Sequence, residues 1–219
     1  MRNSQRRFYV DDAIYFVTTV THGRHPFFLE PTFADIFVLD LWFASKIKDF
    51  RLYGYTVTAD HAHLLVQPNR LSDISSVIAS LKRNVSRDIN DLIHERPRTR
   101  DSAGDDSNRP LPESTESMKA SIEAMKSAHP TMNPLNIERH CQLTLDLRSK
   151  FSKESRLEFQ SAQFRWQKSF YDHVVRDEKD FLRHLEYICG NAVKHKLTST
   201  AEDWRWKWVF GEDEPIELR

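Results

Sequence analysis

The chain has 219 residues, enough for one domain with a substantial core, and its 32 basic residues balance 32 acidic residues. This neutral charge gives no general attraction for nucleic acid, and two cysteines are too few for a disulfide framework. No apolar run approaches the roughly 20 residues that span a bilayer, and the N-terminus lacks the apolar stretch of a signal peptide. These features predict a cytoplasmic protein with a single domain over residues 1–219 and no membrane partner.

The first half of the chain alternates between strand-like and helix-like segments. Residues 13–21 are β-branched and aromatic and predict a strand. A turn at residues 23–26 follows it. Residues 32–48 and 74–94 show helical spacing of apolar side chains, with Thr32 and Ser72 as candidate N-caps, and residues 52–67 between them predict two strands. This order favours the α+β class, with an antiparallel sheet and helices packed on one face.

The second half begins with a break in this pattern. Prolines recur between residues 97 and 134 and residues 101–117 are polar, which predicts a flexible insertion at about 95–158. A short amphipathic helix over residues 115–127 is compatible with the same stretch. A helix is expected at residues 178–194, where Asp177 can act as N-cap and acidic residues in the first turn suit the helix dipole.

Two histidines lie within the strand-like run of residues 55–66, at His61 and His63. Strand residues two apart share a face, so these imidazoles should project side by side, whereas Asp60, Ala62 and Leu64 should point the other way. Two imidazoles on a rigid strand form half of a divalent-metal site. Two independent histidines, on the surface or in the core, are the alternative that the pair alone leaves open.

The helix expected at residues 178–194 places Tyr187 and Asn191 one turn apart on one face. His184 and Lys194 fall on much the same stripe. A tyrosine within a helix is commonly a packing residue, so its position alone leaves its role open. The opposite stripe is apolar and should anchor the helix through Phe181, Leu182, Leu185, Ile188 and Ala192.

Three segments carry a resemblance to a known family. They read Y-F-V-T-T-V-T-H-G-R-H-P-F from Tyr15, D-H-A-H-L-L-V from Asp60, and W-Q-K-S-F-Y-D-H-V-V-R-D-E-K-D-F-L-R-H-L-E-Y-I-C-G-N-A-V-K-H-K-L from Trp166. In this order they resemble the HUH single-tyrosine transposases, and most closely the REP-associated tyrosine transposases found beside palindromic repeats in bacterial chromosomes. The resemblance covers about residues 8–94 and 160–210 and implies a ferredoxin-like or RRM-like antiparallel sheet.

The resemblance also implies roles for individual residues. His61 and His63 match the family's metal ligands, Asn191 matches the third ligand, and Tyr187 matches the nucleophile. Ala192 departs from the proline that usually follows the asparagine. The implied activity is metal-dependent cleavage and rejoining of single-stranded DNA through a covalent 5′-phosphotyrosine, on hairpin-forming repeats. Mg²⁺ prefers oxygen ligands and imidazoles favour Mn²⁺, so the expected cofactor is Mg²⁺ or Mn²⁺.

Single-stranded or hairpin DNA is the expected partner, bound by a monomer or homodimer. A catalytically inactive DNA-binding protein of the same fold and a phosphoesterase that uses water are the alternatives, and Tyr171 is a rival nucleophile. Three tryptophans near the end of the chain can stack on bases or dock as a strand on the core. Candidate DNA contacts are basic or aromatic: Lys82, Arg83, Arg87, Arg176, Lys194 and Trp206.

Overall fold

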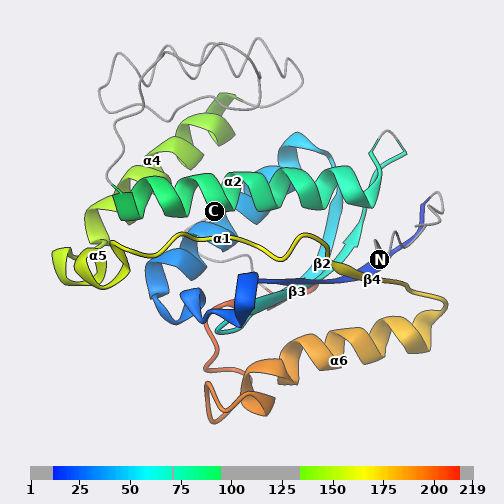
Figure 1. Cartoon of the computed structure of the whole chain (residues 1–219). Coiled ribbons are helices and arrows are strands. Elements are labelled where there is room, and N and C mark those ends of the chain that lie inside the picture. Colours follow the sequence, from blue (N-terminus) through cyan, green and yellow to red (C-terminus); the bar gives the residue numbers. More distant parts are fainter. Residues whose placement is uncertain (1–11, 71, 95–133, 213–219) are drawn as a thin grey trace, which may run out of the picture.

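The computed structural model describes residues 12–70, 72–94 and 134–212, which form an antiparallel sheet between two layers of helices (Figure 1). Within these residues the sheet has five strands in the order β4-β1-β3-β2-β5. The strands are β1 (Tyr15–Val20), β2 (Arg51–Val57), β3 (His61–Gln67), β4 (Tyr171–Val174) and β5 (Lys207–Val209). The helices are α1 (Pro31–Ile47), α2 (Ile74–His94), α4 (Pro134–Lys150), α5 (Lys153–Phe159) and α6 (Glu178–Lys194).

The predicted α+β class and antiparallel sheet are confirmed. The chain order β1-α1-β2-β3-α2-β4 and the strand order of the sheet give a ferredoxin-like arrangement, to which β5 adds a further edge strand. Strand β3 lies at the centre and pairs with both β1 and β2. Its residues are therefore held on both sides by backbone hydrogen bonds, which makes β3 a rigid platform for side chains.

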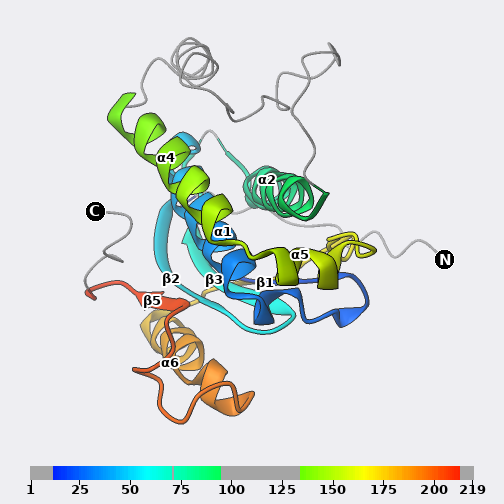
Figure 2. The same ribbon diagram turned by 90° about the vertical axis from the view of Figure 1, so that its left-hand side faces the viewer.

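Helices cover both faces of the sheet, which corrects the expectation that they pack on one face. Helices α1 and α2 lie on one side and α6 lies on the other (Figures 1 and 2). The reason is that β3 is buried on both faces. Ala62, Leu64 and Val66 join the large core under α1 and α2, whereas His61 and His63 face α6. A strand buried on both faces needs a covering layer on each side.

Two of the three predicted N-caps are displaced by a residue or two. Helix α1 begins at Pro31, and Glu30 caps it by accepting a hydrogen bond from the Thr32 N–H at 3.2 Å. Proline suits this first position because it lacks the N–H that would remain unpaired there. For α2, the Asp73 carboxylate rather than Ser72 accepts the Ser76 N–H, at 2.7 Å. Asp177 caps α6 as predicted.

The prediction of a flexible insertion over residues 95–158 is wrong for residues 134–158. Residues 134–150 form α4, which packs against α1, and α5 follows directly (Figure 2). Phe151 between these helices is 5% exposed, and its ring lies 5.4 Å from that of Phe33 on α1. Burial of this apolar surface orders a segment that the surrounding prolines suggested was loose. Residues 95–133, with the helix predicted at 115–127, lie outside the described residues.

Candidate metal and nucleophile site

Strand β3 presents two buried histidines to α6 at the centre of the sheet. His61 and His63 are each 5% exposed, and their ring centroids lie 4.8 Å apart with the ring planes at 81°. The alternation of the strand thus places both imidazoles on one face, as the pattern predicted. They are not independent surface groups, because they share one buried space with side chains of β1 and α6.

Hydrogen bonds hold the Nδ1 atom of each ring. His63 Nδ1 lies 2.8 Å from the Thr18 hydroxyl, and His61 Nδ1 lies 2.6 Å from an Asp60 carboxylate oxygen. Thr58 also approaches His61 Nδ1, at 2.8 Å. With Nδ1 engaged, Nε2 is the atom available to a ligand, and the Nε2 of His63 is buried with no hydrogen-bond partner among the described residues. A carboxylate behind the imidazole is the usual support of a metal-binding histidine.

The position of Asp60 differs from the sequence expectation. It was expected to point away from His61, but it precedes β3 in the turn after β2, where the strand alternation does not apply. Burial alone would raise the pKa of the Asp60 carboxyl, but hydrogen bonds and charge from His61 and Arg24 lower it overall. The carboxylate therefore stays ionised and can hold a proton on His61 Nδ1.

Burial keeps both imidazoles neutral near pH 7. It lowers the pKa of His63 to about 3, and the positive charges of neighbouring groups, among them His195 and Lys194, act in the same direction. Burial also lowers the pKa of His61, against the opposing effect of Asp60. A neutral imidazole keeps the nitrogen lone pair that binds a metal, so both rings are ready to act as ligands at physiological pH.

Helix α6 brings Tyr187 and Lys194 to the histidines, and the buried Asn191 lies between them along the helix. The Tyr187 ring is half-buried and lies 5.0 Å from the His63 ring, at 79°. The Lys194 ammonium lies 5.1 Å from the centre of the Tyr187 ring. Asn191 is 1% exposed, and neither atom of its side-chain amide has a hydrogen-bond partner within the described part of the chain. A buried unpaired amide is unfavourable, so it points to a partner that the protein alone does not supply.

The close approach of α6 to the sheet depends on Gly54. This residue faces the helix from β2, and a Cβ placed on it would lie only 3.3 Å from the Cδ1 atom of Ile188. Ile188 and Ala192 are fully buried, as expected for the apolar stripe, whereas Leu182 is 50% exposed and does not anchor the helix. The small residue on β2 therefore lets the tyrosine helix lie against the histidine strand.

Three residues at the site were missed by sequence reasoning. The ring of Phe16 lies 5.3 Å from His63 and 5.8 Å from Tyr187, and Thr18 holds His63. Both residues lie on β1, where alternation puts them on the face opposite Tyr15 and Val17. The pairing of Thr18 with His63 decides their place, and this register was not evident from sequence. Asp60 is the third missed residue.

Several candidate DNA contacts are engaged within the protein. The Lys82 ammonium donates to the backbone carbonyls of Gln167 and Ser169, at 2.6 and 3.1 Å. Arg87 pairs with Asp88 at 2.8 Å, with 24% of its side chain exposed. The Trp206 indole donates to Asp35 at 2.7 Å. These contacts favour structural roles for the three residues, and they agree with the docking alternative for the tryptophan segment.

The remaining candidates are more accessible. Arg83, Arg176 and Lys194 are exposed, and Lys194 lies beside Tyr187. The rival nucleophile Tyr171 lies on the edge strand β4 and is 66% exposed. It pairs with Thr18 of β1, so a whole strand separates it from His63 on β3. Among the two tyrosines weighed as nucleophile, Tyr187 is the one in contact with the histidine pair.

The fold and the site define an α+β domain in which a strand-borne histidine pair faces a tyrosine helix. Among solved structures, the chain resembles the REP-associated tyrosine transposase bound to a REP hairpin, with a TM-score of 0.54 over 94% of this chain and 81% of that chain. Sequence identity between the two is 16%, so this likeness concerns the fold. It agrees with the ferredoxin-like arrangement of β1 to β4.

Sequence comparison shows a similarity to one family. Residues 9–102 match the family of IS200-like transposases. A Haemophilus influenzae protein assigned to the REP-associated tyrosine transposases is 40% identical over 53 residues, which are 24% of this chain and 30% of that protein. The REP-associated tyrosine transposase of Escherichia coli K12 is 41% identical over 39 residues, 18% of this chain and 24% of that protein. The resemblance to this family is therefore confirmed.

The extent of these matches is limited. The aligned segments span less than a third of the length of either relative. They show a similarity to transposases over part of the chain. Within the described residues no helix has the combination of length and apolar character that crossing a membrane requires.

Proposed function

We propose that this protein cleaves and rejoins single-stranded DNA with a divalent metal ion, through a covalent bond between Tyr187 and a 5′-phosphate. One observation carries the proposal. Two neutral histidines and a tyrosine ring meet between β3 and α6, although more than 100 residues separate the two elements in the sequence, and a buried unpaired amide lies one turn further along α6. Each of these groups has a defined part in metal-assisted phosphoryl transfer.

The residues fit a divalent ion. His61 and His63 offer neutral imidazoles whose Nδ1 atoms are already held, and Asn191 offers an amide oxygen with no partner. These three neutral donors would leave the charge of the ion undiminished. Mn²⁺ suits imidazole donors and Mg²⁺ is the oxygen-preferring alternative. When bound, such an ion supplies positive charge to the non-bridging oxygens of a phosphodiester as negative charge develops there.

Tyr187 supplies the nucleophile. Its phenolic oxygen attacks phosphorus and forms the O–P bond, while the bond between phosphorus and the 3′-oxygen breaks. The phenol proton is lost and the departing oxygen gains a proton, so the products are a 5′-phosphotyrosine and a free 3′-hydroxyl. The reverse attack by a 3′-hydroxyl rejoins a strand. Because a phenol is a weak nucleophile while protonated, the nearby Lys194 ammonium assists by favouring negative charge in this space.

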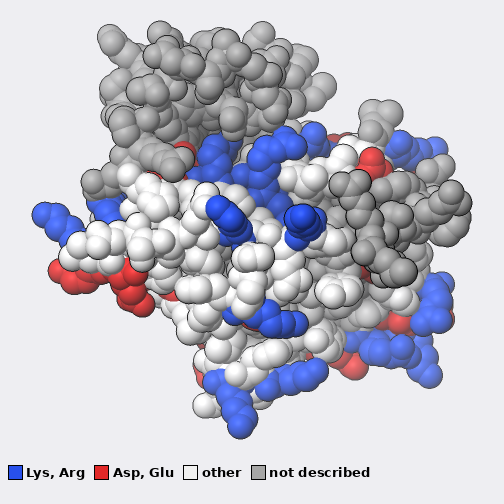
Figure 3. All heavy atoms as spheres, in the orientation of Figure 1, with Lys and Arg blue, Asp and Glu red and all other residues white. Residues whose placement is uncertain are grey.

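The substrate is proposed to be single-stranded or hairpin DNA. The site lies between a strand and a helix, where a flexible unpaired backbone can reach the tyrosine more readily than a duplex can. Figure 3 shows Lys and Arg side chains on the face formed by α2 and the segment that leads into β4, and few Asp or Glu near its centre. Exposed basic residues of these elements include Arg83, Arg165 and Lys168. They provide the local positive charge that the neutral chain lacks overall.

The test uses single-stranded oligonucleotides that contain hairpin-forming repeats from the gene's own flanks. The protein is incubated with them in Mn²⁺, and products are separated on denaturing gels. The parent should give a shortened strand and a protein–DNA adduct. Tyr187→Phe keeps the ring and its packing but removes the oxygen, so cleavage and adduct should vanish together while the thermal melting temperature changes little.

Tyr171→Phe is the matched control, because it removes the same atom from the rival tyrosine and should leave the adduct. Asn191→Ala should weaken Mn²⁺ binding and slow cleavage, and excess Mn²⁺ should partly restore the rate. An adduct that survives Tyr187→Phe and disappears in Tyr171→Phe would move the active site off α6. Cleavage without any adduct would identify water as the nucleophile and reject the covalent mechanism.

A further inference from the structure

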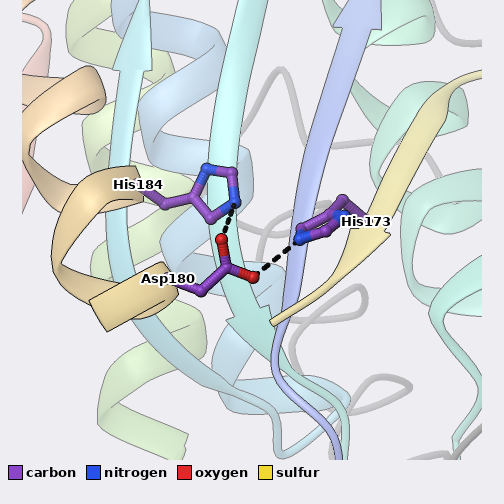
Figure 4. A group of neighbouring side chains, drawn as sticks. All are labelled: His173, Asp180 and His184. Atoms are coloured by element: carbon purple, nitrogen blue, oxygen red, sulfur yellow. Dashed lines mark hydrogen bonds and ion pairs between the residues drawn. The ribbon is translucent and has the colours of Figure 1, made fainter. Parts of the chain in front are cut away.

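A second group of metal-ligating side chains lies beside the proposed active site. It consists of His173 from β4 and of Asp180 and His184 from α6, and we call it the β4–α6 cluster (Figure 4). His173 Nε2 lies 2.8 Å from one carboxylate oxygen of Asp180, and His184 Nε2 lies 3.7 Å from the other. All three ligand atoms lie within 4.8 Å of one another. The three side chains thus converge on one point, from two different elements.

The cluster is held in place from several sides. Asp180 is 4% exposed, and its own N–H donates to the cap residue Asp177 at 2.8 Å. The His184 ring stacks on Phe16, with a centroid distance of 4.2 Å. Its Nε2 atom is buried and has no hydrogen-bond partner among the described residues. The Asp180 oxygen at 3.7 Å lies beyond hydrogen-bond distance, so this buried nitrogen points to a ligand.

The protonation states suit a cation. The hydrogen bond from His173, together with the charges of His173 and Arg176, lowers the pKa of the Asp180 carboxyl well below its usual range. Burial lowers the pKa of His184, so this ring is neutral near pH 7. The cluster then offers one carboxylate and the neutral imidazole of His184, with the imidazole of His173 beside them, and carboxylate with imidazole is a donor set typical of Zn²⁺ and related ions.

The distances agree with this donor set. Bonds of about 2.1 Å in a tetrahedral zinc site place the ligand atoms roughly 3.4 Å apart. The two separations from Asp180, 2.8 and 3.7 Å, lie on either side of this value, and all three ligand atoms lie within 4.8 Å of one another. The His173 side chain is 40% exposed, which gives an ion a path of entry and leaves room for water as a further ligand.

We propose that the β4–α6 cluster binds a divalent transition-metal ion of the Zn²⁺ type, at a site separate from His61 and His63. The ion ties the edge strand β4 to the first turns of α6, which otherwise packs mainly on β2, β3 and β5. Since His184 precedes Tyr187 by one turn, the ion fixes the part of the helix that carries the proposed nucleophile. The binding itself does not depend on the proposed DNA chemistry.

Two arginines at the cluster allow a test of the sign of the bound charge. Arg176 Nε and Arg183 Nη1 lie 3.5 and 3.4 Å from the Asp180 oxygens, and the two side chains are 70% and 60% exposed. Such long contacts by exposed side chains are weak, and an entering cation can displace them. Removing one guanidinium should strengthen the binding of a cation. The same change should weaken the binding of an anion such as phosphate.

The experiment is a Co²⁺ titration of the full chain, followed by its visible absorption spectrum, with Zn²⁺ as competitor. We expect the parent to bind two ions. His173→Gln should bind one, whereas the matched control His22→Gln, which removes an exposed imidazole elsewhere, should still bind two. The double variant His61→Ala/His63→Ala should keep one ion, and Zn²⁺ should displace it. If this double variant fails to fold, the loss of one ion in His173→Gln decides the question.

A second arm uses Arg183→Gln. We expect this variant to bind Co²⁺ at the β4–α6 cluster about threefold tighter than the parent, because a repelling charge is removed. Equal stoichiometry in the parent and His173→Gln would overturn the proposal. Inorganic phosphate binding that weakens in Arg183→Gln, with no Co²⁺ bound that depends on His173, would also overturn it and identify an anion site. Loss of DNA cleavage alone, with both ions still bound, would count against the proposed function and leave this site standing.

Discussion

Replacing Gly54 by alanine should disturb the contact between β2 and α6 on which the site depends. A Cβ at this position would lie 3.2 Å from the carbonyl oxygen of Trp208 and 3.3 Å from Ile188 Cδ1 and Val209 Cγ1. All three distances are shorter than ordinary van der Waals contacts, and one of the neighbours is backbone. Relief therefore requires that α6 or β5 move away from Gly54 on β2 by a few tenths of an ångström.

The expected loss in free energy of unfolding follows from two opposing effects. Overpacking of a closely packed contact costs about 1–3 kcal/mol. A glycine-to-alanine change in a compatible backbone recovers about 0.4–1 kcal/mol by reducing the entropy of the unfolded chain. We expect a net destabilisation of about 1–2 kcal/mol, together with weaker Mn²⁺ binding, because Asn191 lies in the helical turn that follows Ile188.

A double-mutant cycle measures this coupling. Ile188→Val removes the Cδ1 atom nearest to the new methyl group and alone should cost about 0.5–1.5 kcal/mol. The double variant Gly54→Ala/Ile188→Val should lose less free energy of unfolding than the two single variants together, by about 0.5 kcal/mol or more. Urea unfolding gives the stabilities, and calorimetry gives the Mn²⁺ affinities. A Gly54→Ala protein more stable than the parent, or strictly additive losses, would refute the idea that Gly54 sets the distance between helix and sheet.

Two further predictions concern single carboxylates. Asp60→Asn removes the charge that holds His61 Nδ1 and should weaken Mn²⁺ binding by about 10–100-fold in calorimetry, and unchanged affinity would contradict the supporting role of Asp60. Burial and the nearby Asp88 raise the pKa of Asp40 to about 6, above the usual value of about 3.9, so the folded state holds this proton more tightly than the unfolded state. The contribution of Asp40 to stability is therefore complete below about pH 4 and decreases by about 2–3 kcal/mol as the pH rises through 6. Relative to the parent, Asp40→Asn should become more stable by this amount between pH 4 and 7 in urea unfolding, and a difference independent of pH would show that Asp40 titrates normally.

Local patterns in the sequence were sufficient to predict several elements of the structure. The bounds of α6 at 178–194 and its cap Asp177 follow from helical spacing and first-turn acidity, which depend on neighbouring residues only. The pairing of His61 and His63 on one face follows from the alternation of a strand. The resemblance of three segments predicted the ferredoxin-like sheet and the similarity to IS200-like transposases, and both are confirmed.

Contacts between distant parts of the chain were decided only by the tertiary structure. The register of β1 against β3 brings Thr18 to His63, and a glycine on β2 determines how near α6 can lie. Packing on α1 turned residues 134–150 from an expected flexible insertion into a helix. The indole of Trp206 donates to Asp35, which lies 171 residues earlier in the chain. Such pairings depend on which buried surfaces fit together, and periodicity within a single segment contains no information about its partner.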